Sequence, residues 1–306
     1  MKFFASFLIF AACAVFAAGC SNAKANTDSK KIIFAYGNSV HLWGDHENEI
    51  MCEVLAELVN KFTPHTAQAC DANAPDIAEK FASADAVIII CEGGEHHPFK
   101  GERLPLLNAA KNLGAFHYAL DFGTKEGDSA LIKNIGGAFE LNWSVNPMYP
   151  AKFESLPNHP ASKGANPFEL YDEWYFNMRF SQNGKVTNLL KTVPPDSARK
   201  RSFGTHSGNQ FVRANLGREE TILWLYEKAD GTRGLGFTGG HSLFSLYENN
   251  LRKLLLNSAI WLAHGDIPAD GFHSKMPAFD ELASRIKKEK RPDQDSYTAR
   301  WRKISE

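Results

Sequence analysis

Histidines stand at or near the ends of the strands that the sequence predicts most clearly. His41 follows the apolar segment Lys31–Tyr36, His241 follows Arg233–Phe237 after a Gly-Gly turn, and His117 lies within a third apolar segment. The carboxyl ends of parallel strands share one edge of a sheet, and open α/β proteins bind their ligands at that edge. We therefore expect these imidazoles to gather there, where they could bind a metal ion or transfer protons.

A helix predicted after the first strand brings further polar groups to the same edge. Its apolar residues recur at helical spacing from Ile50 to Phe62, and Asp45 is the expected N-cap. His46 and Glu47 would then lie at the positively polarised start of this helix.

The aromatic segment 172–180 is predicted to be extended. Side chains alternate along a strand, so Glu173 and Tyr175 would share one face while Asp172 takes the other. A carboxylate and a tyrosine beside aromatic rings are typical of a carbohydrate site, to which Trp143 would add stacking surface. A half-buried edge strand without a site is the alternative interpretation.

Strands and helices alternate through the first half of the chain. Apolar segments at 31–36, 84–91 and 115–120 are predicted strands, and 75–83 and 104–113 are predicted helices. This alternation is typical of βαβ units, and it indicates an α/β fold with a mainly parallel sheet.

The second half departs from this pattern. Residues 136–220 are predicted as an excursion from the regular units. The segment 220–228 is a predicted strand that a hairpin turn joins to the strand before His241, and 248–263 is a predicted helix. The charged residues 269–306 are expected to form a tail with little to bury.

Composition limits the function classes. The chain has 306 residues, of which 43% are hydrophobic, and this is enough for one large core. The formal net charge is −1, so nothing in the charge balance favours a nucleic acid as a partner.

The N-terminus predicts export. Residues 1–20 combine a positive start, an apolar run and a small-residue cleavage region, as signal peptides do. Cys20 directly follows Ala-Gly, which resembles the lipobox of bacterial lipoproteins, and residues 21–30 would form a polar tether. We expect a protein of the cell envelope that is held to the membrane by a lipid on Cys20 and faces the periplasm. Signal cleavage without lipidation is the alternative.

Three cysteines remain after the leader. A disulfide between Cys52 and Cys70 is one expectation for an exported chain. Cys91 ends an isoleucine-rich strand and is expected to be a buried small apolar residue rather than a nucleophile.

Five separated motifs together resemble the ThuA-like (trehalose-utilisation) family. They are His41 with Asp45-His46-Glu47, His159-Pro160 with Pro167-Phe168, Asp172-Glu173-Trp174-Tyr175, Gly-Phe-Thr-Gly-Gly-His at 236–241 and the helix at 250–261. The resemblance covers residues 31–268. It implies a flavodoxin-like three-layer sandwich of the class I glutamine amidotransferase type, and a role in the metabolism of keto-sugars or disaccharides.

Glutaminase chemistry does not fit this chain. Amidotransferases of the fold place a nucleophilic cysteine on a sharp turn after a central strand. The comparable segment here holds His117 and no cysteine, so no thiolate stands there for acyl transfer.

A metal centre is the first of three hypotheses for the site. His41, His46 and His241 would supply imidazole nitrogens, and zinc is the metal that neutral imidazoles with a carboxylate favour. Their spacing matches no zinc signature such as His-Glu-x-x-His, so the sequence does not fix a cofactor.

Acid–base catalysis without a metal is the second hypothesis. His117 or His46 would transfer a proton, with Glu173 or Asp172 as its partner. An enzyme of this kind would be an isomerase that moves a proton beside the carbonyl of a keto-sugar, or a hydrolase of a disaccharide derivative.

A lipid-anchored sugar-binding protein without turnover is the third hypothesis. Stacking on Trp143, Trp174 and Tyr175 would then dominate, and His41 and His241 would contribute to binding the sugar. In all three hypotheses the ligand is a small carbohydrate, and the sequence is compatible with a homo-oligomer.

Overall fold

The computed structural model describes residues 28–305. The predicted leader, Cys20 and most of the tether lie outside the described residues. Within them, the structure contains no helix with the length and apolar character needed to cross a bilayer.

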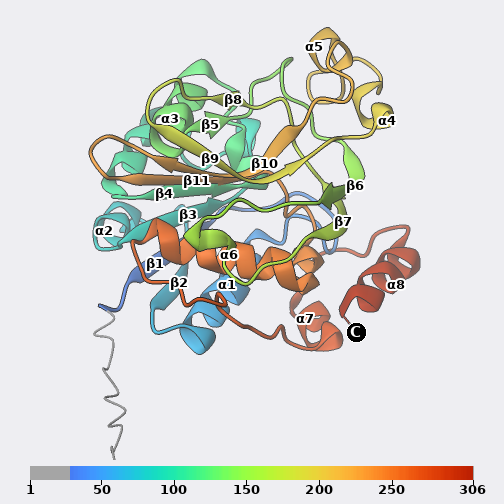
Figure 1. Ribbon diagram of the computed structural model, residues 1–306. Coiled ribbons are helices and arrows are strands. Elements are labelled where there is room, and N and C mark those ends of the chain that lie inside the picture. Colours follow the sequence, from blue (N-terminus) through green and yellow to red (C-terminus); the bar gives the residue numbers. More distant parts are fainter. Residues whose placement is uncertain (1–27, 306) are drawn as a thin grey trace, which may run out of the picture.

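Seven strands form one mixed sheet through the middle of the molecule (Figure 1). In spatial order they are β2 (Thr66–Asp71), β1 (Lys31–Tyr36), β3 (Ala86–Ile90), β4 (Leu113–Phe116), β11 (Arg233–Phe237), β10 (Glu220–Glu227) and β9 (Lys185–Thr192). The strands from β2 to β11 are parallel, whereas β10 and β9 run antiparallel to their neighbours. The central strands are buried on both faces, which is why they are apolar throughout.

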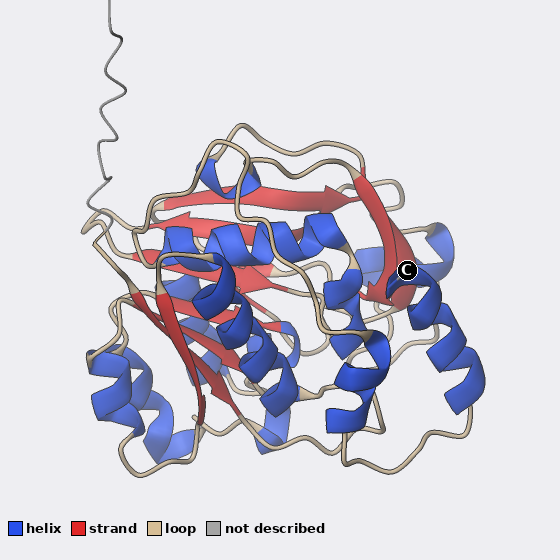
Figure 2. Ribbon diagram, turned by 90° about the horizontal axis from the view of Figure 1, so that it is seen from below, coloured by secondary structure: helices blue, strands red, loops and turns tan. Residues whose placement is uncertain are grey.

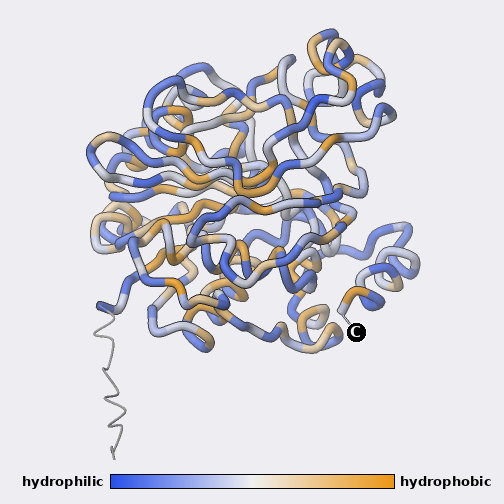
Figure 3. Tube along the Cα trace, in the orientation of Figure 1, coloured by the Kyte–Doolittle hydropathy of each residue, from blue (hydrophilic) through white to orange (hydrophobic). Residues whose placement is uncertain are grey.

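Helices cover both faces of the sheet and make three layers (Figures 1 and 2). On one face lie α1 (Asn48–Phe62) and α6 (Asn249–Leu262). On the other lie α2 (Ile77–Ala82), α3 (Lys125–Ile135) and the 3₁₀ helix η2 (Gly101–Ala109). Apolar residues concentrate along the strands and the helix sides that face them (Figure 3). The predicted three-layer α/β sandwich is therefore confirmed.

Shorter elements complete the described chain. They are the strands β5 (Gly137–Ala138), β6 (Met148–Phe153), β7 (Phe168–Glu173) and β8 (Arg179–Phe180), the helices α4 (Asp196–Arg199), α5 (Gln210–Arg213), α7 (Phe279–Arg285) and α8 (Gln294–Ser305), and the 3₁₀ helices η1 (Gly94–His96), η3 (His117–Leu120), η4 (Pro160–Ser162) and η5 (Leu243–Tyr247).

The excursion predicted over residues 136–220 contains two small antiparallel sheets, β5–β8 and β6–β7, and the short helices α4 and α5. Its strand β9 returns to the main sheet and pairs with β10. The predicted hairpin between β10 and β11 is present, with Leu225 opposite Leu235.

Several predicted boundaries are wrong. The strand predicted over 115–120 is β4, which ends at Phe116, and the next four residues form η3. The helix predicted over 104–113 is the 3₁₀ helix η2, which contains Pro105. Asp45 does not cap α1: the helix begins at Asn48 with Glu47 at the N-cap, because the Asp45 carboxylate binds side chains from elsewhere in the chain.

The disulfide expected between Cys52 and Cys70 is absent, and Cys91 is also a free, buried thiol. Cys52 belongs to the core between the sheet and α1, whereas Cys70 and Cys91 belong to the core on the opposite face. The sheet therefore separates Cys52 from the other two thiols.

The expectation that residues 269–306 have little to bury is also wrong. Within this segment Phe279 and Leu282 of α7 and Tyr297 and Trp301 of α8 are buried in the core that α1 and α6 share. Trp301 is 1% exposed and packs near Phe244. The C-terminal segment is thus part of the folded unit.

This packing predicts the effect of shortening one side chain. Trp301→Ala should lower the free energy of unfolding by about 3–5 kcal/mol, because it removes a fully buried indole and leaves a cavity. Urea denaturation at equilibrium measures the change. The exposed Lys303→Ala on the same helix serves as the control and should change it by less than about 0.5 kcal/mol. A Trp301→Ala loss no larger than that of the control would show that the segment contributes no packing energy.

Candidate functional site

Polar side chains meet at the carboxyl edge of the parallel strands. His41 and His46 follow β1, Glu92 follows β3, His117 follows β4 and His241 follows β11. These four strands are neighbours in the sheet. The chain passes from β1 outward to β2 and then back across to β3, so the site lies beside the point where the strand order reverses, where ligands of such sheets bind.

Four atoms converge at the centre of this edge. His46 Nε2 lies 3.0 Å from His241 Nδ1 and 3.1 Å from His117 Nε2. Glu173 Oε2 lies 3.3 Å from both His117 Nε2 and His241 Nδ1. All four side chains are largely buried, with 2% of His46 and 14% of His241 exposed. We call these residues the His₃–Glu cluster.

The outward-facing nitrogens of the three rings determine where their protons are. His117 Nδ1 lies 2.9 Å from the carbonyl oxygen of Thr238, which can only accept a hydrogen bond. His46 Nδ1 lies 3.0 Å from Glu92 Oε1, and His241 Nε2 lies 3.3 Å from Asp45 Oδ2. Each neutral ring therefore carries its proton on the outer nitrogen and turns a lone pair inward.

Three inward lone pairs and a carboxylate oxygen need a cation between them. Four of the contacts between these atoms are 3.0–3.3 Å, and all four atoms lie within 4.8 Å of one another. These contacts are close to the spacing of about 3.3 Å between neighbouring ligand atoms of a zinc ion with bonds of about 2.0–2.1 Å. Metal-binding histidines also characteristically donate the other ring N–H to a carboxylate or a backbone carbonyl, as all three rings do here. The residues present therefore fit a zinc ion.

The pKa values reflect the same demand for positive charge. Burial and the neighbouring rings of His117 and His241 lower the pKa of His46 to about 3 against the effect of Glu92. Burial also opposes a charge on His241, but its bonds to Asp45 and Glu173 raise its pKa to about 10. Without a metal ion, the cluster therefore relieves its repulsion by holding a proton on His241.

Two histidines of the cluster have a strained backbone. His46 has φ 47° and His117 has φ 53°, in the left-handed region that side chains other than glycine rarely adopt. His117 turns sharply out of β4 into η3, so its ring points across the sheet edge toward His46.

A second group surrounds Glu92. Its Oε1 atom lies 3.0 Å from Nδ1 of both His41 and His46, and the two rings stack with centroids 3.6 Å apart. His41 is the more exposed ring, at 34%, and therefore lies between the cluster and solvent. Glu92 was not among the predicted site residues, although it follows a buried strand as the histidines do.

Asp172 takes a different place from Glu173 and Tyr175, as the predicted alternation requires. Glu173 and the Tyr175 hydroxyl both approach His117, the latter at 3.4 Å from Nε2. Asp172 is fully buried, and its oxygens accept hydrogen bonds from the backbone N–H groups of Gly240, Ser242 and Glu173. Asp172 therefore holds the loop that carries His241, and Glu173 is the acid that meets the imidazoles.

Trp143 lies in another cluster. Its ring packs against the Arg179 guanidinium at 3.5 Å and against Phe211 at 4.4 Å. Among residues 28–305, no ring contact joins it to the site histidines. The predicted ligand set of His41, His46 and His241 also changes, because His41 pairs with Glu92 while His117 and Glu173 join the other two histidines.

Comparison with protein-family models gave no match, and comparison with curated proteins gave none. Among solved structures, a protein from Bacteroides uniformis ATCC 8492 described as ThuA-like matches with a TM-score of 0.54 and 19% identity, over 80% of this chain and 95% of that chain. The fold is that of a ThuA-like protein. A second protein described in this way, from Parabacteroides merdae ATCC 43184, aligns with a TM-score of 0.48 and 13% identity, over 81% of this chain and 98% of that one.

The His₃–Glu cluster predicts that zinc stabilises this ThuA-like fold. Free zinc at 1,000 times its dissociation constant should add about 4 kcal/mol to the free energy of unfolding, because only the folded chain presents the converging ligands. Thermal and urea unfolding with zinc and with a chelator measure the difference.

His117→Gln should abolish this zinc-dependent gain. His206→Gln is the matched control, because this histidine is 35% exposed and pairs with Asp121 outside the cluster, and it should keep the gain. Equal stabilisation of the wild-type protein and His117→Gln by zinc would contradict the assignment of the cluster.

Proposed function

We propose that this protein is an exported, lipid-anchored carbohydrate enzyme with a zinc ion at the His₃–Glu cluster, acting on a keto-sugar or a related disaccharide derivative. The observation that carries the proposal is the convergence of three inward imidazole nitrogens beside a carboxylate. A sugar-binding protein without turnover would have no use for this repulsive arrangement, since neutral hydrogen-bonding groups would bind a sugar at lower cost.

The four residues of the His₃–Glu cluster have two different roles, metal ligand and acid–base group. Catalytic zinc sites use three protein ligands and keep a position open, so we assign His46, His117 and His241 as the ligands and Glu173 as the acid–base group beside them. When bound there, zinc would act as a Lewis acid on a sugar oxygen.

Glu173, Tyr175 and His41 would each act on the substrate in a different way. Burial opposes a charge on Glu173, but the neighbouring His117 and His241 lower its pKa, so its carboxylate is ionised and can accept a proton from the carbon beside a carbonyl. Burial raises the pKa of the Tyr175 hydroxyl, so this group stays protonated and can donate to a substrate oxygen. The partly exposed His41 ring offers a face for the sugar to pack on.

The choice of substrate rests on the resemblance to the ThuA-like family, which implies keto-sugars or disaccharides. Of the two predicted reaction classes we propose isomerisation, because the resemblance implies a keto-sugar and a carboxylate base beside a Lewis acid can move the proton next to its carbonyl. We therefore infer that proton transfer at a keto-sugar is the reaction.

Exchange of substrate hydrogen with solvent tests this function. Zinc-loaded protein in D₂O should exchange the proton beside the carbonyl of a 3-keto-sugar, which proton NMR follows as loss of one signal. Glu173→Gln should keep the zinc and lower the exchange rate by at least about 100-fold, because the amide cannot accept the proton.

Glu169→Gln is the matched control on the same strand, since its carboxylate is exposed and pairs with Lys152, and it should exchange at the wild-type rate. Loss of zinc from Glu173→Gln would make Glu173 a ligand and not the base. Zinc-loaded wild-type protein that exchanges no substrate hydrogen would contradict the proposed reaction.

A further inference from the structure

The C-terminal segment 288–297 lies against the two loops that carry His46 and His241. The Trp43 N–H donates to the backbone oxygen of Glu289, at 3.2 Å. The two loops are themselves joined, because the His46 N–H donates to the His241 carbonyl oxygen at 2.8 Å and the Leu243 N–H donates to Gly44. Three side chains of the C-terminal segment, Lys288, Arg291 and Tyr297, contact this junction.

Tyr297 places its hydroxyl between the two loops. The oxygen lies 2.7 Å from Asp45 Oδ1, 3.1 Å from the Gly44 carbonyl oxygen and 2.6 Å from Ser242 Oγ. Burial and the Asp45 charge raise the pKa of Tyr297, so the hydroxyl keeps its proton. Tyr297 can therefore donate to the Asp45 carboxylate while it accepts from Ser242.

Arg291 binds the other oxygen of the same carboxylate. Its Nη1 atom lies 2.5 Å from Asp45 Oδ2, which is also the oxygen that faces His241 Nε2 at 3.3 Å. Two side chains of the C-terminal segment thus fix the acceptor that orients the His241 ring and its proton.

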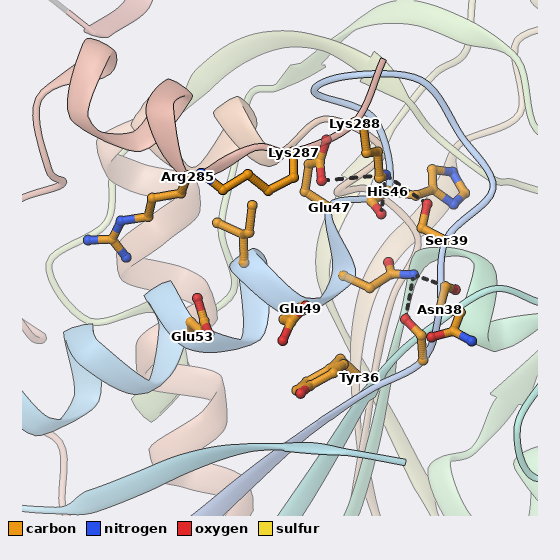
Figure 4. A pocket seen from close by; sticks show the side chains of 13 residues that line it. Tyr36, Asn38, Ser39, His46, Glu47, Glu49, Glu53, Arg285, Lys287 and Lys288 are labelled. Atoms are coloured by element: carbon orange, nitrogen blue, oxygen red, sulfur yellow. Dashed lines mark hydrogen bonds and ion pairs between the residues drawn. The ribbon is translucent and has the colours of Figure 1, made fainter. Parts of the chain in front are cut away.

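Lys288 acts on the backbone of the neighbouring loop. Its ammonium donates to the carbonyl oxygen of Asp45 at 2.7 Å. It also donates to the carbonyl oxygen of His46 at 3.0 Å and to the Ser39 hydroxyl at 2.8 Å (Figure 4). With His46 and Glu47 it lines a cavity of about 460 Å³. A left-handed backbone such as that of His46 persists only where its surroundings fix it, and Lys288 supplies part of that constraint.

We propose that Lys288, Arg291 and Tyr297 are positioning residues of the zinc site. They act through Asp45 and the backbone of His46, so that the rings of His46 and His241 present their inward nitrogens in the geometry that binds the ion. The inference rests on the proposed zinc site and adds to it a segment outside the 31–268 region that carries the family resemblance.

Zinc affinity and the visible spectrum of the cobalt-substituted protein test this inference on the full chain. Tyr297→Phe keeps the ring in its aromatic surroundings, near Trp43 and Trp301, and removes only the hydroxyl. We expect its zinc dissociation constant to rise about 10-fold, the scale of losing an outer partner of a metal ligand, and its cobalt bands to shift. Arg291→Gln should act in the same direction.

Asp45→Asn shows whether Tyr297 acts through Asp45. In the Asp45→Asn background, Tyr297→Phe should weaken zinc binding by much less than it does alone, because its acceptor is already changed. Arg285→Gln is the control: this arginine precedes the segment and pairs with Glu57 and Glu281, so zinc affinity should be unchanged.

The measurements separate failure of the zinc site from failure of the positioning role. Folded wild-type protein that binds neither zinc nor cobalt would overturn the zinc site and this inference together. If the wild-type protein binds zinc while Tyr297→Phe and Arg291→Gln match it in affinity and in cobalt spectrum, only the positioning role is overturned. An equal effect of Tyr297→Phe with and without Asp45→Asn would also overturn it, because the effect would then be general.

Discussion

Repulsion among three inward imidazole lone pairs and one carboxylate governs this structure. His117 must carry its proton on the nitrogen that faces the Thr238 carbonyl oxygen, and Glu92 and Asp45 hold the protons of His46 and His241 in the same outward way. With all three rings neutral, the inner nitrogen of His46 lies 3.0 Å from that of His241 and 3.1 Å from that of His117 with no proton between them. A buried site of this kind is stable only with a positive charge. Without a metal ion, a proton on His241 supplies this charge, and its pKa is accordingly raised to about 10.

The fold places the cluster by bringing β1, β4 and β11 to one edge and by straining the chain where they end. The left-handed backbones of His46 and His117 each cost on the order of 1–3 kcal/mol, which the surrounding hydrogen bonds must offset. Asp172 accepts hydrogen bonds from the backbone of the His241 loop, and Tyr297 of the C-terminal segment contacts both loops. The converging imidazoles, the backbone strain and the packing of α8 are thus parts of one arrangement.

The sequence predicts the parallel core and most of the cluster, because buried strands leave an apolar pattern and their carboxyl ends meet at one edge. Alternation along the chain correctly separates Glu173 and Tyr175 from Asp172. Contacts between distant segments leave no such pattern: the mixed charges around Tyr297 give no sign that it reaches Asp45, and Trp143 has the composition of a sugar site but packs on Arg179. Cys52 and Cys70 show the same limit, since only the folded sheet reveals that it separates them.

A crystal structure of the protein grown with zinc, with diffraction data on both sides of the zinc absorption edge, tests the central claim most directly. The account predicts one anomalous peak between His46, His117 and His241, about 2.0–2.1 Å from each inward nitrogen. Its place between these rings also requires their outer nitrogens to keep the bonds to Glu92, Thr238 and Asp45. A well-ordered cluster with no anomalous peak, and with the three rings turned away from one another, would contradict it.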